Sequence, residues 1–236
     1  MAIPKINSNP EYDVVVPSTG ERITYRPYLV KEEKILMLAF ESGEGKQATR
    51  AIGNTLNACV QTEGFDAFKL TTYDVEFLFI TIRSRSVGET TQIIMPCKEC
   101  KTKNNVVVDL SELTMDDAEV KTEVVELTDD ISVELTYPTY GQVLQTELGE
   151  SGIENSLAVI SNSILSINTE EERYGRDDFT QNEVVEFVES LTTEQFRKLG
   201  TFLNGIPKLT KEVEFKCVEC GTQNSSTLAG MQDFLS

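Results

Sequence analysis

Alternating apolar and polar residues near the start of the chain predict a β-hairpin. Tyr12–Val16 and Glu21–Tyr25 are rich in β-branched and aromatic residues, and they flank the turn sequence Pro17–Gly20. The spacing then becomes helical, and Val30–Ser42 predicts a helix that ends at Gly43. Apolar residues cover a wide arc of this helix, which indicates burial on more than one side.

Two further helices and a pair of strands follow in the pattern. Gln47–Gln61 predicts the second helix from its apolar face. Val75–Ser86 is ambiguous, because its β-branched and aromatic residues also suit a strand, but its length and the capping side chains before it favour a helix. Thr90–Met95 and Val106–Leu110 predict two strands.

The pattern after residue 120 predicts a second hairpin and then mainly helices. Val124–Leu127 and Ile131–Tyr137 are its strands, and Pro138 ends the second one. The charged stretch Asn168–Asp178 predicts a solvated loop, and Glu212–Phe215 predicts a late strand. Helical spacing and helix-start residues predict helices over 140–148, 153–166, 180–190 and 192–203.

Composition describes an ordinary globular chain with a strongly acidic surface. Of its 236 residues, 39% are hydrophobic and 25% are charged, which does not suit a disordered chain. A net charge of −18 repels phosphate backbones, so we expect no nucleic-acid partner. We also expect no membrane partner, because no apolar run approaches the ~20 residues of a membrane span. The first residues lack the apolar core of a signal peptide, and reduced cysteines suit synthesis in the cytosol.

Two matching cysteine pairs carry the candidate chemistry. Cys97-Lys98-Glu99-Cys100 and Cys217-Val218-Glu219-Cys220 both extend to the pattern Cys-x-Glu-Cys-x-Thr-x-Asn, and each follows a strand-like run. Four thiolates are the full ligand set of a closed tetrahedral zinc site. We therefore predict that Cys97, Cys100, Cys217 and Cys220 bind one structural zinc ion and form a two-knuckle zinc ribbon.

Other interpretations of the cysteines stay open at this point. A disulfide within either Cys-x-x-Cys unit is strained, and a redox role favours a helix start near a βαβ pattern, which neither unit has. Coincidence without metal is a third alternative, and four thiolates suit iron as well as zinc. A catalytic zinc is disfavoured because the chain contains no His. Cys59, on a predicted helix, is interpreted as a buried free thiol.

Together these elements predict an α+β fold in which the shared metal fixes the architecture, since the chain between the pairs must leave and return to one point. The expected parts are an N-terminal hairpin with helices (1–96), a two-knuckle zinc ribbon (97–110 and 208–224), and a β-hairpin with a helical insert between the knuckles (111–207).

No set of residues indicates an enzyme. Nucleophile–histidine arrangements are excluded because the chain has no His. Gly43-Glu44-Gly45-Lys46 resembles a phosphate loop only superficially, since it lacks the required spacing and the preceding strand. We therefore expect no catalytic residues.

Several stretches resemble a known family: Pro17–Gly20, Tyr25–Leu36, Tyr73–Phe79 and Arg83–Glu89, followed by the first cysteine pair. The chain is similar over most of its length to the baseplate hub subunit, or hub assembly protein, of T-even-like contractile-tailed bacteriophages. The resemblance implies a non-enzymatic protein that acts in hub assembly in the host cytoplasm, with other hub or tail proteins as partners. Whether it stays in the virion, and whether it is oligomeric there, is left open.

The most specific part of the resemblance begins with Tyr25-Arg26-Pro27-Tyr28. Two aromatic residues beside a guanidinium are enriched at interface hot spots, so Tyr25, Arg26 and Tyr28 are candidate partner-binding residues. The alternative is internal: the aromatic rings pack on the hairpin, and Arg26 pairs with Glu32 or Glu33.

Two functions from other classes compete with a tail protein. A zinc-ribbon adaptor for nucleic acid or the transcription machinery needs a basic surface around the knuckles, where Lys98, Lys101 and Lys103 supply some charge. A thiol oxidoreductase needs an exposed cysteine with a depressed pKa in each pair.

Overall fold

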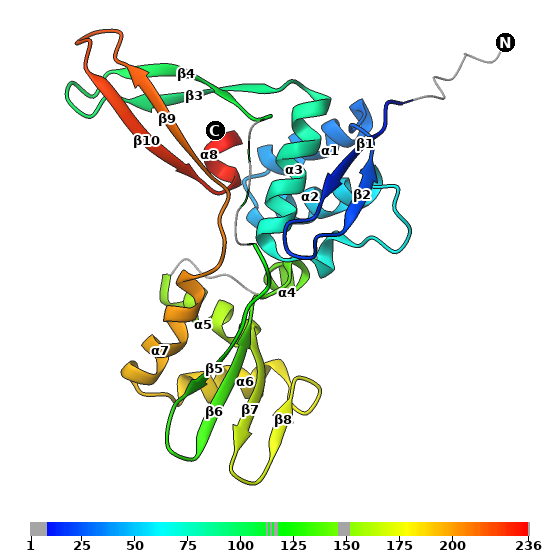
Figure 1. Ribbon diagram of the computed structural model, residues 1–236, viewed down its shortest axis with the longest axis vertical. Coiled ribbons are helices and arrows are strands. Elements are labelled where there is room, and N and C mark those ends of the chain that lie inside the picture. Colours follow the sequence, from blue (N-terminus) through cyan, green and yellow to red (C-terminus); the bar gives the residue numbers. More distant parts are fainter. Residues whose placement is uncertain (1–8, 112, 114, 116–117, 146–151, 236) are drawn as a thin grey trace, which may run out of the picture. The chain divides into compact units, whose positions relative to one another are not determined.

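The computed structural model describes residues 9–111, 113, 115, 118–145 and 152–235. It is a mixed structure of helices and small antiparallel sheets (Figure 1). Two compact units make up the chain. Unit 1 contains Met1–Ala67, Tyr73–Ala118 and Pro207–Ser236, and unit 2 contains Phe68–Thr72 and Glu119–Ile206.

The first part of unit 1 joins a hairpin to three helices. The antiparallel pairing of β1 with β2 and the helices that follow agree with the sequence pattern, and the ambiguous third segment is helical. Asp74 fixes the start of that helix against the hairpin turn, because its carboxylate accepts the Ser18 N–H at 2.9 Å. The elements are β1 (Tyr12–Val15), β2 (Arg22–Tyr25), α1 (Val30–Glu41), α2 (Gly45–Cys59), the 3-10 helix η1 (Ala67–Lys69) and α3 (Thr72–Ser86).

The second part of unit 1 consists of two hairpins from distant parts of the chain. β3 (Thr90–Pro96) pairs with β4 (Lys103–Asp109), and β9 (Thr210–Lys216) pairs with β10 (Gln223–Ala229), both antiparallel. Burial alternates along β4, as expected for a strand with one covered face. The short helix α8 (Met231–Leu235) follows β10. Figure 1 shows the two hairpins running beside each other to a common tip.

Unit 2 is built on a four-stranded antiparallel sheet with the order β5-β6-β7-β8. Thr180 and Thr192 cap two of its helices, and each accepts a hydrogen bond from the backbone N–H three residues ahead, as their sequence positions predict. The elements are β5 (Thr122–Glu126), β6 (Ile131–Thr136), α4 (Tyr140–Gln145), α5 (Gly152–Ser163), β7 (Ile164–Thr169), β8 (Arg173–Gly175), α6 (Gln181–Glu189) and α7 (Thr193–Asn204).

The sheet corrects the expectation of a hairpin with a purely helical remainder. The helix predicted over 153–166 ends at Ser163, and Ile164–Thr169 is strand β7, which pairs with β6 and β8. The loop predicted over 168–178 likewise contains β8. This segment is a strand and not a continuation of the helix: Ile164 and Ser166 are both fully buried, and burial at alternate positions is the period of a strand. Of the helix predicted over 140–148, residues 146–148 lie outside the described residues.

No helix in the described ranges is long and apolar enough to cross a membrane.

Candidate metal centre

Four cysteine sulfurs meet at the common tip of the two hairpins. Cys97 Sγ lies 3.7 Å from Cys220 Sγ, and Cys100 Sγ lies 3.5 Å from Cys217 Sγ. All four sulfurs lie within 4.8 Å of one another. A tetrahedral ion with metal–sulfur bonds of about 2.3 Å separates its ligands by about 3.8 Å, so the cluster is close enough and of the right size to bind one metal ion.

The sulfurs are not arranged as disulfides. All five cysteines of the chain are free. The closest pairs, at 3.5 and 3.7 Å, are far longer than a disulfide bond of about 2.05 Å, and each joins one cysteine from either hairpin. Cys59, the fifth cysteine, is fully buried at the end of α2, away from the cluster.

The two cysteine turns have the same backbone geometry. The Cys97 N–H donates to the Thr102 carbonyl, and the Cys217 N–H donates to the Thr222 carbonyl, both at 2.9 Å. Each turn also needs a residue with positive φ just after its second cysteine: Lys101 has φ 62° and Gly221 has φ 72°. The repeated sequence therefore folds twice into one shape.

Two asparagines connect the turns, because the side chain of each accepts a hydrogen bond from the backbone of the other turn. Asn224 Oδ1 accepts the Lys98 N–H, and Asn104 Oδ1 accepts the Val218 N–H, each at 2.9 Å. Both asparagines are almost fully buried. They are the last residues of the repeated Cys-x-Glu-Cys-x-Thr-x-Asn pattern, so the repeat itself pointed to them, although no role was predicted for them from the sequence.

The turns lower the pKa of both thiols in the first cysteine pair. The backbone N–H of Cys100 lowers the pKa of Cys97 against the effect of burial, and with the Glu99 N–H and the Asn224 side chain brings it to about 6. The hydroxyl and the N–H of Thr102 lower the pKa of Cys100. Thiolate is the form that binds metal.

The candidate partner-binding residues lie at the junction of β2, α1 and α2. Tyr25 is buried, at 2% exposure. Arg26 Nη2 pairs with Glu32 Oε1 at 2.9 Å and also donates to the Ala58 carbonyl, which is the internal pairing described as the alternative above. Tyr28 is half-buried, and its N–H donates to Ser86 Oγ. Partner contact by these residues stays a prediction.

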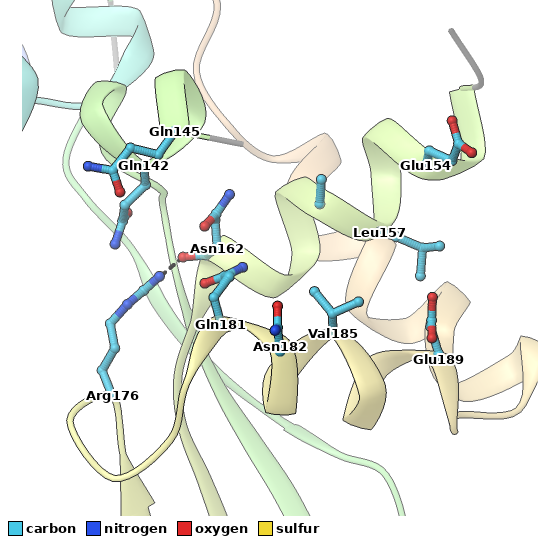
Figure 2. Close-up of a pocket in the computed structure, with 11 residues that line it drawn as sticks. Gln142, Gln145, Glu154, Leu157, Asn162, Arg176, Gln181, Asn182, Val185 and Glu189 are labelled. Atoms are coloured by element: carbon cyan, nitrogen blue, oxygen red, sulfur yellow. Dashed lines mark hydrogen bonds between the residues drawn. The ribbon is translucent and has the colours of Figure 1, made fainter. Parts of the chain in front are cut away.

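Unit 2 contains a cavity of ≈ 630 Å³ that was not predicted from the sequence. Figure 2 shows Arg176 reaching from the loop after β8 toward the end of α5, where its Nη1 donates to the carbonyls of Asn162 and Ile164. The wall is rich in side-chain amides, and its described residues include no Cys, Ser or Thr nucleophile. The amides are Gln142, Gln145, Asn162, Gln181 and Asn182.

The fold and the site define a class: a mixed helix-and-sheet protein with a four-cysteine cluster able to bind a metal ion. Residues 9–236 match the family described as T4 bacteriophage base plate protein. The chain belongs to this family of phage baseplate proteins. No curated protein and no solved structure matches it. Family membership indicates a structural component of the phage tail that contacts other tail proteins.

Proposed function

We propose that this chain is a non-enzymatic component or assembly factor of the baseplate hub and acts through protein–protein contacts. The family match over residues 9–236 is the observation that carries the proposal. The resemblance of Tyr25–Leu36 to hub proteins, noted from the sequence, supports the hub in particular. Assembly in the host cytoplasm follows from this role.

The four-cysteine cluster is proposed to hold one zinc ion that fastens the two hairpins. Cys100 and Cys217 are 117 positions apart, and closing a loop of that length costs about 4 kcal/mol of chain entropy. Zinc binding to four thiolates in small modules contributes about 10–16 kcal/mol, which offsets that cost. With four protein ligands, no position is open for a substrate, which fits a structural and not a catalytic ion.

The adaptor for nucleic acid or the transcription machinery is the weaker candidate. Two of the lysines near the first turn make hydrogen bonds within the chain: Lys98 Nζ donates to the Ser225 carbonyl, and Lys101 Nζ donates to the Lys98 carbonyl. A chain of net charge −18 also repels a nucleic acid at long range. Both observations favour a protein partner.

Affinity purification from infected cells tests the proposal. The tagged full-length chain is expected to recover other hub or tail proteins, identified by mass spectrometry, and no nucleic acid. Recovery of RNA polymerase or nucleic acid without tail proteins would support the adaptor and overturn the hub role.

The same purification tests the proposed contact through Arg26 and Tyr28. Arg26→Ala with Tyr28→Ala is expected to abolish recovery of the partner. Because Arg26 also pairs with Glu32, the comparison variant is Glu32→Gln, which weakens the internal pair and leaves both candidate side chains in place. Unchanged recovery by the folded double variant, or equal loss in Glu32→Gln, would remove these residues from the interface.

A further inference from the structure

Helix α1 exposes far more apolar surface than a surface helix needs. Six of the fifteen exposed large hydrophobic residues in the described chain lie within residues 29–40. Val30 is 79% exposed, and Met37 and Leu38 are each 56% exposed. Apolar residues gathered in this way mark an interaction surface, whereas single ones need no explanation.

Three of these six residues, Val30, Met37 and Leu38, share one face of α1. Glu32, Leu36 and Ala39 are the buried residues of α1 and point its other side into unit 1. Val30, Lys34, Met37, Leu38 and Glu41 recur at the three- and four-residue spacing of a single helix face, opposite the buried one. With Glu33 they line a shallow depression of ≈ 240 Å³. We call these five residues the α1 face.

The charges of the α1 face are arranged to complement themselves. Lys34 and Glu41 lie at equal distances on either side of the Met37–Leu38 step, and neither makes an ion pair with a described residue. If two copies of α1 pair antiparallel about that step, each Lys34 meets the Glu41 of the other copy. A parallel pairing instead places Lys34 against Lys34 and Glu41 against Glu41. The charges therefore select an antiparallel pairing.

We propose that the α1 face binds a second copy of this chain, with the two α1 helices antiparallel and Met37 and Leu38 at the centre. Such an interface is isologous, the commonest kind between identical chains. It covers Met37 and Leu38 and gives Lys34 and Glu41 partners. The inference depends on α1 alone and holds whether or not the hub role does.

The size of the helix sets the strength of the association. A pair of helices with 12 residues each buries less than the ~800 Å² per partner of a standard interface, so the dimer is expected to be weak. The net charge of −18 on each copy opposes it at long range, and salt screens that repulsion. Dimerisation should therefore depend on protein concentration and should persist at about 0.15 M salt.

Sedimentation equilibrium of the full-length chain over a range of concentrations tests the proposal. The wild-type mass is expected to rise from 26.4 kDa toward twice that value. Lys34→Glu and Glu41→Lys should each raise the dimer Kd by about five- to tenfold, since each loses two exposed ion pairs and creates two repulsive ones. Combining K34E with E41K swaps the charges and should restore the wild-type Kd.

Matched variants decide between this pairing and its alternatives. Glu170→Lys makes the same charge change as Glu41→Lys, but on an exposed turn of unit 2. It should leave Kd unchanged, which separates the local pairing from a general charge effect. A wild-type chain that stays at 26.4 kDa at all concentrations would overturn the proposal. So would a double variant no tighter than the single ones, or binding of a different tail protein to α1 in place of a second copy.

Discussion

The two cysteine turns show how much one backbone angle matters at the residue scale. Both turns need positive φ at the residue after their second cysteine, and the chain uses Gly221 in one and Lys101 in the other. A side chain in this left-handed region costs about 1 kcal/mol, whereas Gly has no such cost. The shared pattern around the cysteines predicts that the turns match, but the strain at Lys101 appears only in the structure.

Lys101→Gly is therefore expected to raise the free energy of unfolding by about 0.5–1 kcal/mol, in contrast to most substitutions. Gly221→Ala adds a side chain at the equivalent position of the other turn and should lower the free energy of unfolding by about 1 kcal/mol. Urea denaturation followed by circular dichroism measures both. Equal effects of the same sign would show that the two turns do not share the geometry described.

Glu32 is a second residue whose environment has a measurable consequence. Burial raises its pKa, but hydrogen bonds from Arg26, the Leu29 N–H and Lys31 outweigh burial and hold the pKa below the ordinary value of 4.5. A lowered folded-state pKa means that the ionised carboxylate stabilises the fold above the unfolded pKa. That stabilisation is lost as the pH falls through the folded-state pKa.

Glu32→Gln is expected to lower the free energy of unfolding by about 2 kcal/mol at neutral pH, because it removes a charged acceptor from Arg26. The difference between the two chains should shrink as the pH falls below 4.5, the range in which wild-type Glu32 takes up a proton. Urea denaturation of both chains across this pH range makes the measurement, and the comparison cancels other carboxylates. A difference that stays constant with pH contradicts the assignment.

At the scale of the element, the sequence predicts helices with caps better than it predicts the strands of unit 2. Thr180 and Thr192 cap the N-termini of α6 and α7 through local hydrogen bonds, and a short stretch of sequence is enough to predict such caps. β7 has no such local cause. It continues directly from α5 without a breaker, and its strand form depends on pairing with Val133 of β6 and with Tyr174 of β8. Pairing between distant segments overrode local preference there.

Arg176 holds the junction between α5 and β7. Its Nη1 donates to the carbonyls of Asn162 and Ile164, which lie where the helix ends and the strand begins. Burial lowers the pKa of this guanidinium, but two charge-assisted hydrogen bonds compensate for that burial. The junction is therefore held by one side chain from the loop after β8.

Arg176→Met is expected to lower the stability of unit 2 by about 1.5–3 kcal/mol, the range for hydrogen bonds to a charged group. Arg173→Met is the matched control. Arg173 is 63% exposed and pairs with Glu134, so its loss should cost no more than about 1 kcal/mol. Hydrogen exchange of the β7 amides, read beside urea denaturation, locates the effect. An Arg176 variant no worse than the control would show that the junction does not need it.

At the scale of the whole molecule, repetition in the sequence was the most informative feature. The pattern shared by the two cysteine pairs predicted that residues 117 positions apart would meet, and the structure places Cys100 and Cys217 side by side. The local pattern predicted the β5–β6 hairpin of unit 2. It could not predict the pairing of β7 with β6 and β8, nor the cavity beside Arg176, because these depend on how separate elements pack. A repeated motif can be recognised however far apart its two copies lie in the sequence, whereas no short stretch of sequence shows how separate elements pack.

Removal of the metal should affect the two units differently. Chelation is expected to loosen the tips of β3, β4, β9 and β10, because the proposed ion no longer opposes about 4 kcal/mol of loop-closure entropy. Unit 2 has its own sheet and should keep its structure. Hydrogen exchange before and after chelation distinguishes the units. Equal protection of the hairpin tips in both states would mean that the ion contributes nothing to holding them.

The most direct measurement of the proposed clip is the metal content of the purified full-length chain by elemental mass spectrometry. The account predicts one zinc ion per chain, kept in Cys59→Ala and lost when Cys97, Cys100, Cys217 and Cys220 are all replaced by serine. A wild-type chain without bound metal, or a four-serine variant with as much zinc as wild type, would contradict it.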